Sequence, residues 1–257
     1  MVEFDTAGGA RFVKADLHVH TPGSYDYNDK VNARELIEAF EAEDLELVAV
    51  TDHNTTGFFE ELAEEAAESS VTVLPGVEIT TGQSGAHQIH MTAIFPPEKA
   101  DDIDNLLYEI GADGDPQGTI ADSTIPRICE AVRSFEGLPI LAHIDANAGA
   151  HHELSERENP TRREVFDTEN VAALEITSLE TRTEFPEFTH IRSSDAHSIS
   201  QIGRGYTYLK MNEPSFEGLR TALSDPESRI SIDGQLNNHV SIDGLFVNNG
   251  FLQNRHL

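Results

Sequence analysis

Tryptophan is missing from this 257-residue chain, and cysteine occurs only once, as Cys129. One cysteine excludes an intramolecular disulfide and any zinc site built from several thiolates, so a metal would need nitrogen and oxygen ligands. The sequence also lacks an apolar run of about 18 residues and a charged-then-apolar leader. We therefore expect a soluble, cytoplasmic protein with no membrane partner.

Basic side chains are also scarce. The chain has 17 Lys and Arg against 46 Asp and Glu, which gives a net charge of -29. The acidic residues are spread along the whole sequence, and their repulsion is screened when the Debye length falls to about 3 Å at 1 M salt. We interpret this composition as an adaptation to the cytoplasm of a high-salt organism; an acidic partner-binding face is the alternative. A nucleic-acid substrate would need cations as intermediaries on such a surface.

Short runs rich in Val, Ile and Leu alternate with amphipathic segments, which is typical of an α/β protein. The helical segments include 32–44, in which Asn32 and Glu35 have the spacing of a capping box, and 123–137, which ends on Gly137. The alternation predicts a parallel sheet covered on both faces, and we expect a distorted seven-stranded (β/α)7 barrel. The predicted strands are 13–19, 47–51, 71–79, 88–94, 138–143, 171–176 and 188–194.

The remaining segments are predicted to lie outside the barrel strands. Stretches 96–122 and 147–170 look like surface excursions, the first with one helix and the second as a loop able to cover a site. After residue 205 we expect one more strand and a helix that starts at Pro214. The repeats RISIDG and HVSIDG predict a small C-terminal β appendage. We therefore divide the chain into a barrel, 1–225, and an extension, 226–257.

The segment DLHVHTPGSYD places His18 and His20 two residues apart, followed by Asp26. Residues i and i+2 of a strand point to the same side, so both imidazoles can converge on one point. The turn-forming residues Thr21 to Ser24 would fold Asp26 back over the same place. Two imidazoles and a carboxylate together suggest a metal site, although an H-x-H pair also occurs by chance.

Side chains able to bind metals recur on six of the seven predicted strands. Taken singly, each has an ordinary explanation: Glu78 could be a solvated strand end, and His90 and His143 could be hydrogen-bonded core histidines. Because the carboxyl ends of parallel strands share one rim, a common metal site explains all of them at once. His87, His151, His152, His190, His239 and His256 do not share the pattern. The candidate ligands are His18, His20, Asp26, His53, Glu78, His90, His143, Asp195 and His197.

The series DLHVHTPGSYD, VTDHN, GVEIT, HQIH, LAHIDA and SSDAH resembles the PHP family, the polymerase and histidinol phosphatase superfamily of metal-dependent phosphoesterases. The likeness covers about residues 12–210. It implies a distorted barrel with up to three metals. Asp26 stands where some members have histidine. Carried over by position, the resemblance places one metal with His18, His20, Glu78 and Asp195, a second with Glu78, His90 and His143, and a third with Asp26, His53 and His197.

The chemistry expected from this resemblance uses two or three divalent transition metals, Mn, Zn or Fe, which suit mixed imidazole and carboxylate ligands. A metal-activated hydroxide would attack the phosphorus, with Glu78, Asp195 and His197 at the catalytic centre. Arg204 could bind the substrate phosphate, or could form a surface salt bridge. Asp52 could orient an imidazole, or could stabilise a turn.

Three functions remain open at this point. The motifs favour hydrolysis of phosphate esters in nucleotides or nucleic-acid ends. A small-molecule phosphatase of the histidinol-phosphate kind is the alternative among enzymes. In a third hypothesis the barrel is a sensing or regulatory module of a PHP-ATPase machine, because the tail HVSIDGLFVNNGFLQNRHL weakly resembles the start of an ATPase segment. The chain contains no G-x-x-x-x-G-K-[ST] motif, so an ATPase would be a further domain or subunit.

Overall fold

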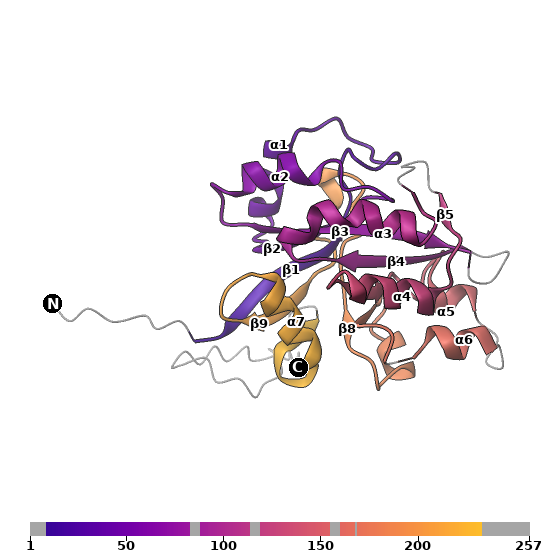
Figure 1. Ribbon diagram of the computed structural model, residues 1–257. Coiled ribbons are helices and arrows are strands. Elements are labelled where there is room, and N and C mark those ends of the chain that lie inside the picture. The colour runs from indigo at the N-terminus through magenta and orange to yellow at the C-terminus, as the bar shows by residue number, and fades with distance from the viewer. Residues whose placement is uncertain (1–8, 83–87, 114–118, 155–159, 168, 233–257) are drawn as a thin grey trace, which may run out of the picture.

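The structure, a computed structural model, describes residues 9–82, 88–113, 119–154, 160–167 and 169–232 (Figure 1). It is a mixed α/β fold in which ten described strands form one nearly closed sheet. The strands are β1 (Arg11–Val19), β2 (Leu47–Val50), β3 (Thr72–Thr81), β4 (Ile89–Ile94), β5 (Ile120–Ala121), β6 (Leu138–Leu141), β7 (Ala173–Glu175), β8 (His190–Ile191), β9 (Thr207–Met211) and β10 (Ile230–Ile232). The α-helices are α1 (Ala33–Ala42), α2 (Phe59–Ala66), α3 (Ile103–Glu109), α4 (Ile125–Ser134), α5 (Ala150–Glu153), α6 (Pro160–Val165), α7 (Phe216–Ser224) and α8 (Pro226–Arg229).

The strand order is β10-β9-β1-β2-β3-β4-β6-β7-β8, with β5 paired to β3. The barrel-like class is confirmed, but the expectation of a wholly parallel sheet is wrong. β4 runs antiparallel to both β3 and β6, and β9 runs antiparallel to β1 and β10. Only seven residues separate Thr81 from Ile89. A parallel crossover needs a dozen or more residues, so β4 has to reverse direction.

The segment that follows β8 brings the two sides of the sheet together. The amide of Asp195 donates to the carbonyl of His18 (2.9 Å), and the amide of His20 donates to the carbonyl of Ala196 (3.0 Å). The end of β1 therefore has a backbone partner on each side, because β2 lies along its other edge. Residues far apart in sequence meet here at one end of the barrel.

The inside of the barrel is apolar over most of its length. Alternate residues of the strands, such as Leu17, Leu74 and Ile140, form one buried cluster, and α7 packs Phe216 and Leu219 against it. Two further clusters lie between the sheet and its helices: α1 and α2 cover β1 and β2, while α3 and α4 cover β3, β4 and β6 (Figure 1). Buried apolar surface on both sides of the sheet is what fixes this architecture.

At one end of the barrel the inward-facing rows become polar. In β3 the row that begins with Leu74 continues to Glu78, and in β7 the row with Ala173 ends on Glu175. In β1 the inward side chains Val13, Ala15 and Leu17 give way to the outward-packed Val19, and the pairing with β2 shifts between Asp16 and Val19. This irregularity exchanges the two faces, because side chains alternate along a strand. The two histidines of β1 and its end are thereby turned inward.

Several local predictions can be compared with the described residues. Asn32 caps α1 in a capping box with Glu35, as expected. The next predicted helix ends at Ser134 rather than at Gly137. A Cβ added at Gly137 would lie 2.4 Å from the ring of Phe95. Helix α7 begins after Ser215, whose side chain accepts from Gly218 N, and not at Pro214.

The regions predicted to lie outside the barrel are described only in part. The described residues of 96–122 carry one α-helix, α3, and those of 147–170 carry the short helices α5 and α6. Of the predicted extension 226–257, residues 226–232 form α8 and β10, and β10 joins the barrel sheet through β9. HVSIDG and the rest of the tail lie outside the described residues.

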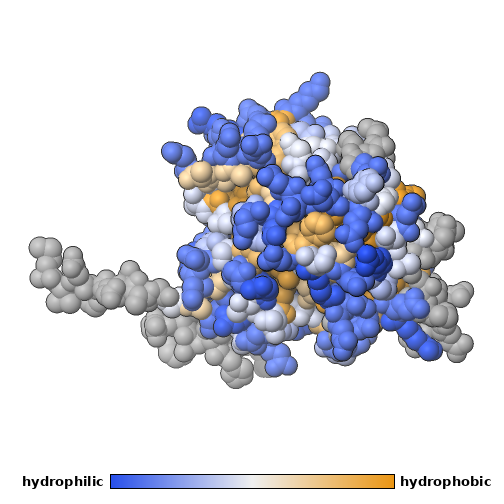
Figure 2. All heavy atoms as spheres, in the orientation of Figure 1, coloured by the Kyte–Doolittle hydropathy of each residue, from blue (hydrophilic) through white to orange (hydrophobic). Residues whose placement is uncertain are grey.

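Hydrophilic side chains cover most of the face of the molecule seen in Figure 2. Apolar residues are visible only in smaller areas between them. Within the described ranges, every helix is too short or too polar to cross a bilayer.

Candidate metal centre

A cavity of about 830 Å³ opens at the polar end of the barrel. Its lining comes from strands β3, β4 and β7 and from the segments that follow β1, β2, β6, β7 and β8. The charged and imidazole side chains among the lining residues are Asp26, His53, Glu78, His90, His143, Glu175, Arg192, Asp195, His197 and Arg204.

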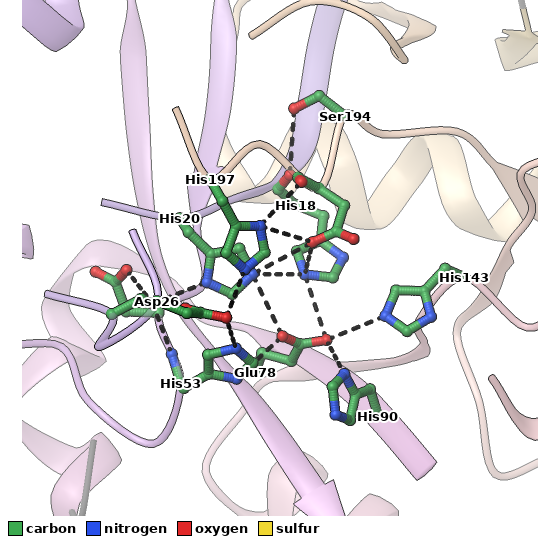
Figure 3. A network of polar contacts seen from close by, with 12 residues as sticks. His18, His20, Asp26, His53, Glu78, His90, His143, Ser194 and His197 are labelled. Atoms are coloured by element: carbon green, nitrogen blue, oxygen red, sulfur yellow. Dashed lines mark hydrogen bonds and ion pairs between the residues drawn. The ribbon is translucent and has the colours of Figure 1, made fainter. Parts of the chain in front are cut away.

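The Glu78 carboxylate lies at the centre of the site and is buried (Figure 3). Its two oxygens lie close to ring nitrogens from five histidines. The nitrogen–oxygen distances are 2.9 Å to His90, 3.2 Å to His53, 3.3 Å to His20, 3.3 Å to His143 and 3.4 Å to His18. These histidines come from different parts of the barrel, so their meeting point depends on the whole fold.

All nine predicted ligands come together in this site. Their donor atoms form three sets, and within each set all donor atoms lie within 4.8 Å of one another. His20 belongs to two of these sets. We expected Glu78 to be a ligand of two metals, together with His18 and His20 in one set and with His90 and His143 in another. Its carboxylate lies within 3.4 Å of ring nitrogens of all four histidines, as such a bridging ligand would. The sets are His18, His20 and Asp195; Glu78, His90 and His143; and His20, Asp26, His53 and His197.

The spacing of the donor atoms fits bound cations. Two ligand atoms that each lie about 2.1 Å from one ion are on the order of 3 Å apart. His18 Nε2 and His20 Nε2 are 3.2 Å apart, and Asp195 Oδ1 lies 3.5 Å from the first and 3.4 Å from the second. Asp26 Oδ1 and His53 Nδ1 are buried and form no hydrogen bond within the described part of the chain. His53 Nδ1 lies 3.2 Å from Glu78 Oε2, and Asp26 faces His53 Nε2 and His197 Nε2 with its other oxygen, at 3.4 and 3.2 Å.

The electrostatics of the site also favour positive charge. Burial raises the pKa of Glu78, but the surrounding histidines outweigh burial and hold that pKa well below its ordinary value. Asp26 and Asp195 have lowered pKa values for the same reason. Burial lowers the pKa of His18, yet the carboxylates of Glu175, Glu78 and Asp195 raise it well above its ordinary value. Divalent metals can supply the positive charge that these carboxylates favour.

Two of the ligand-bearing turns have unusual backbone conformations. His143 has φ 25° and Asp195 has φ 49°, in the left-handed region that few non-glycine residues adopt. Neighbouring glycines allow close packing of these turns. A Cβ on Gly149 would lie 2.2 Å from the His143 carbonyl oxygen, and one on Gly205 would lie 2.1 Å from that of Ser193. The chain thus accepts local strain and crowding where it directs two ligands into the cavity.

Each histidine of the H-x-H pair is held through its Nδ1 atom. His18 Nδ1 donates to Glu175 Oε2 at 2.8 Å. The Ser24 hydroxyl donates to Asp52 (2.7 Å), so its lone pair accepts from His20 Nδ1 at 2.8 Å. These bonds leave both Nε2 atoms free to bind a metal, because they fix the tautomer of each ring.

Glu175 and Ser24 were missed as functional residues by reasoning from the sequence. Strand 171–176 was predicted but was the only one to which no ligand was assigned, although it contains Glu175. The contacts of Asp52 fit both roles considered for it. It stabilises the turn by accepting from the Thr21 amide (2.7 Å), and it orients His20 through the Ser24 hydroxyl. A short-range signal for the Glu175 contact was absent, since 157 positions separate His18 from Glu175, whereas Ser24 lies only four residues after His20.

Arg204 lines the cavity, and among the described residues its guanidinium pairs with backbone carbonyls and not with a carboxylate. Its Nε donates to the Ser194 carbonyl (2.6 Å) and its Nη2 to the Asp195 carbonyl (3.1 Å). The guanidinium thus braces the turn that carries Asp195.

The other histidines within the described residues do not join the cluster. His151 Nδ1 contacts the Arg162 guanidinium (2.8 Å), and the exposed His152 contacts Glu153 (3.0 Å). His190 is buried in β8, and burial lowers its pKa to about 4. His87, His239 and His256 lie outside the described residues.

Comparisons with known proteins agree with this geometry. The model of the PHP domain family matches residues 16–175, and a model described as PHP-associated matches residues 183–226. Among curated protein sequences, none matches this chain.

Solved structures with the same fold include the lesion-specific endonuclease Q of Pyrococcus furiosus, with a TM-score of 0.70 and 18% identity over 86% of this chain and 58% of the other. Endonuclease Q in complex with a 27-mer duplex substrate carrying an abasic lesion has a TM-score of 0.69 and 16% identity, over 85% of this chain and 58% of the other. A proposed metal-dependent phosphoesterase of Bifidobacterium adolescentis has a TM-score of 0.57 and 17% identity, over 82% of this chain and 95% of the other. This chain spans only 58% of the length of the endonuclease Q chains.

Proposed function

Because this chain belongs to the PHP domain family, we propose that it is a metal-dependent phosphoesterase that hydrolyses nucleotides or nucleic-acid ends with up to three divalent transition metals. The first metal would be held by His18, His20 and Asp195, and the second by His90 and His143, with Glu78 between them. The third would be held by Asp26, His53 and His197. Manganese, zinc and iron all suit this mixture of imidazole and carboxylate.

One observation carries the proposal: the buried carboxylate of Glu78 lies within 3.4 Å of ring nitrogens of five histidines at the floor of an open cavity. An ionised carboxylate offers about four lone-pair sites, so five imidazole nitrogens exceed what hydrogen bonding to Glu78 alone would use. When bound, divalent metals would supply an activated water and would neutralise charge on the phosphate.

Side chains that line the cavity would orient the phosphate of the substrate. Arg204 holds the carbonyls of Ser194 and Asp195, and its Nη1 forms no hydrogen bond to the described residues, so we assign it to a phosphate oxygen. Arg192 also lines the cavity. The volume of about 830 Å³ falls within the range of nucleotide-sized sites. The duplex-bound endonuclease Q neighbour supports a nucleic-acid substrate.

The direct test is hydrolysis by purified protein loaded with manganese in high salt. We expect release of phosphate or nucleotides from a panel of nucleotides, oligonucleotides and small phosphate monoesters. His18→Ala should abolish this activity, because it removes a ligand from the buried centre. His152→Ala is the matched control, since the ring of this exposed histidine contacts Glu153 and is not part of the cluster. Activity that survives His18→Ala would refute the assignment of the site, and a preference for small aliphatic phosphates would favour the histidinol-phosphate-like alternative.

A second prediction concerns Glu175, which orients His18 by accepting a hydrogen bond from its Nδ1 atom. Glu175→Ala should weaken metal binding by about 10–100-fold, the usual effect of removing the outer partner of a histidine ligand. Glu175→Gln should lose less metal affinity than Glu175→Ala, because the glutamine amide oxygen can still accept from His18 Nδ1. Titration calorimetry with manganese measures both. The exposed Glu180→Gln is the control, and wild-type affinity in Glu175→Ala would contradict the orienting role.

A further inference from the structure

Tyr25 stands at the mouth of the cavity and is 55% exposed. Single exposed aromatic residues are ordinary on protein surfaces, so its significance depends on position. Its ring centroid lies 5.4 Å from that of His53, at an interplanar angle of 34°. It also borders a second hollow of about 670 Å³, whose lining includes Pro22, Ser24 and Tyr27. Tyr25 therefore lies between the metal centre and open surface.

The backbone that presents Tyr25 is fixed on both sides of the ring. The amide of Ser24 donates to the Thr21 carbonyl (2.9 Å), and the amide of Tyr27 donates to the Ser24 carbonyl (3.2 Å). The buried Asp52 accepts from the Thr21 amide and from the Ser24 hydroxyl, both at 2.7 Å. An exposed ring on such a rigid turn loses little further entropy when a flat ligand packs on it.

The face of Tyr25 suits a flat, uncharged group. Its hydroxyl forms no hydrogen bond to the described residues, and its single ring contact there is His53. A chain with a net charge of -29 has few cations with which to grip a phosphate backbone. Stacking on an aromatic ring is not screened by salt, so it can contribute affinity where ionic contacts are weak.

We propose that Tyr25 is a stacking platform for the base of a nucleotide whose phosphate lies in the metal centre. This inference rests on the proposed function and deepens it, because it makes the nucleobase a determinant of specificity. Sugar phosphates that lack a base would fit the same centre but would leave the ring of Tyr25 uncovered. The second hollow gives the base and any following nucleotide room beside the ring.

The test compares substrates that differ only in the base. Nucleoside 5′-monophosphate is paired with ribose 5-phosphate, and an oligonucleotide with a normal terminal nucleotide is paired with one whose terminal nucleotide is abasic. Tyr25→Leu should raise KM for the base-containing member by about ten-fold, the typical effect of losing one base–aromatic stack. Its kcat and the KM for the abasic member should not change. Tyr25→Phe should behave like the wild type, since stacking needs the ring and not the hydroxyl.

A binding measurement makes the result independent of turnover. The chain has no tryptophan and five tyrosines, so tyrosine emission is directly observable. Titration with the nucleoside monophosphate, corrected for absorption by the base, should quench part of this emission in the wild type. The quenching should disappear in Tyr25→Leu and persist in Tyr108→Leu, a control at a 78% exposed tyrosine on α3 that borders neither hollow.

The outcomes separate the two proposals. Quenching that depends on Tyr25, without hydrolysis of any probe, would support the stacking role and refute the proposed reaction. Hydrolysis in which Tyr25→Leu affects base-containing and abasic substrates equally, with unchanged quenching, would overturn the stacking role and leave the reaction standing.

Discussion

A Glu78→Gln variant should lose more than about a hundred-fold in activity and should bind fewer metal ions than the wild type. Removing an outer partner of a metal ligand costs about 10–100-fold, and Glu78 is expected to contact the ions directly. Glutamine has almost the same shape as glutamate, so the cavity should keep its form while losing the central negative charge. Elemental analysis of the purified variant, together with hydrolysis rates, measures both effects.

The matched control for this substitution is Glu130→Gln, at an exposed glutamate that pairs with Arg127 on α4. It should change neither metal content nor rate, because exposed ion pairs contribute little. A Glu78→Gln protein with full metal content and normal hydrolysis would show that the convergence of five histidines on Glu78 has no part in catalysis.

Removal of the metals should make the stability of the protein depend on pH in a characteristic way. Without metals, the raised pKa values of His18, His20, His53 and His143 mean that their ion pairs stabilise the fold fully below about pH 6.5. This contribution is lost as pH rises through the raised values. The lowered pKa values of Asp26, Glu78 and Asp195 give a contribution that is present above about pH 4 and is lost at lower pH. The cluster therefore stabilises chelated protein most between these limits.

Metal binding should show the opposite trend, because imidazoles bind metals only when they are deprotonated. At pH 8.5 a free metal concentration about a hundred times Kd would add about 2.7 kcal/mol to the free energy of unfolding. Thermal unfolding with and without chelator, at pH 6.0 and pH 8.5 in the same high salt, measures the difference. Chelator should lower Tm more at pH 8.5, and an equal or absent effect at both pH values would contradict this assignment of the cluster.

The positions of the candidate ligands could be predicted because each is local to a strand end. His18 and His20 lie at the end of β1, and Glu78 lies in β3 on the same face as the interior Leu74. Period-2 alternation pairs His18 with His20 and Glu78 with Leu74, and parallel strands share one rim, but the irregularity in β1 that turns the two histidines inward is not visible in the pattern. The strand segments themselves were also identifiable, because short runs of Val, Ile and Leu are typical of buried strands.

The direction of β4 could not be read from the same signals. A strand pattern looks identical in both directions, and only the short connection after β3 indicates reversal. Because β4 is antiparallel, His90 reaches the shared rim from the beginning of its strand and not from the end. The bonds from His18 to Glu175 and from Ser24 to Asp52 were likewise beyond prediction from single motifs, since they depend on packing between distant segments.

The pairing of β3 with β4 has a consequence for how the protein matures. Glu78 lies opposite Thr92, and Thr80 lies opposite His90. If either strand slipped by one residue, its side chains would exchange faces, and its ligand would point away from the barrel. Metal uptake during refolding should therefore occur only in molecules whose strands are correctly aligned. Metal occupancy would therefore report the fraction of chains that had folded with the correct strand register.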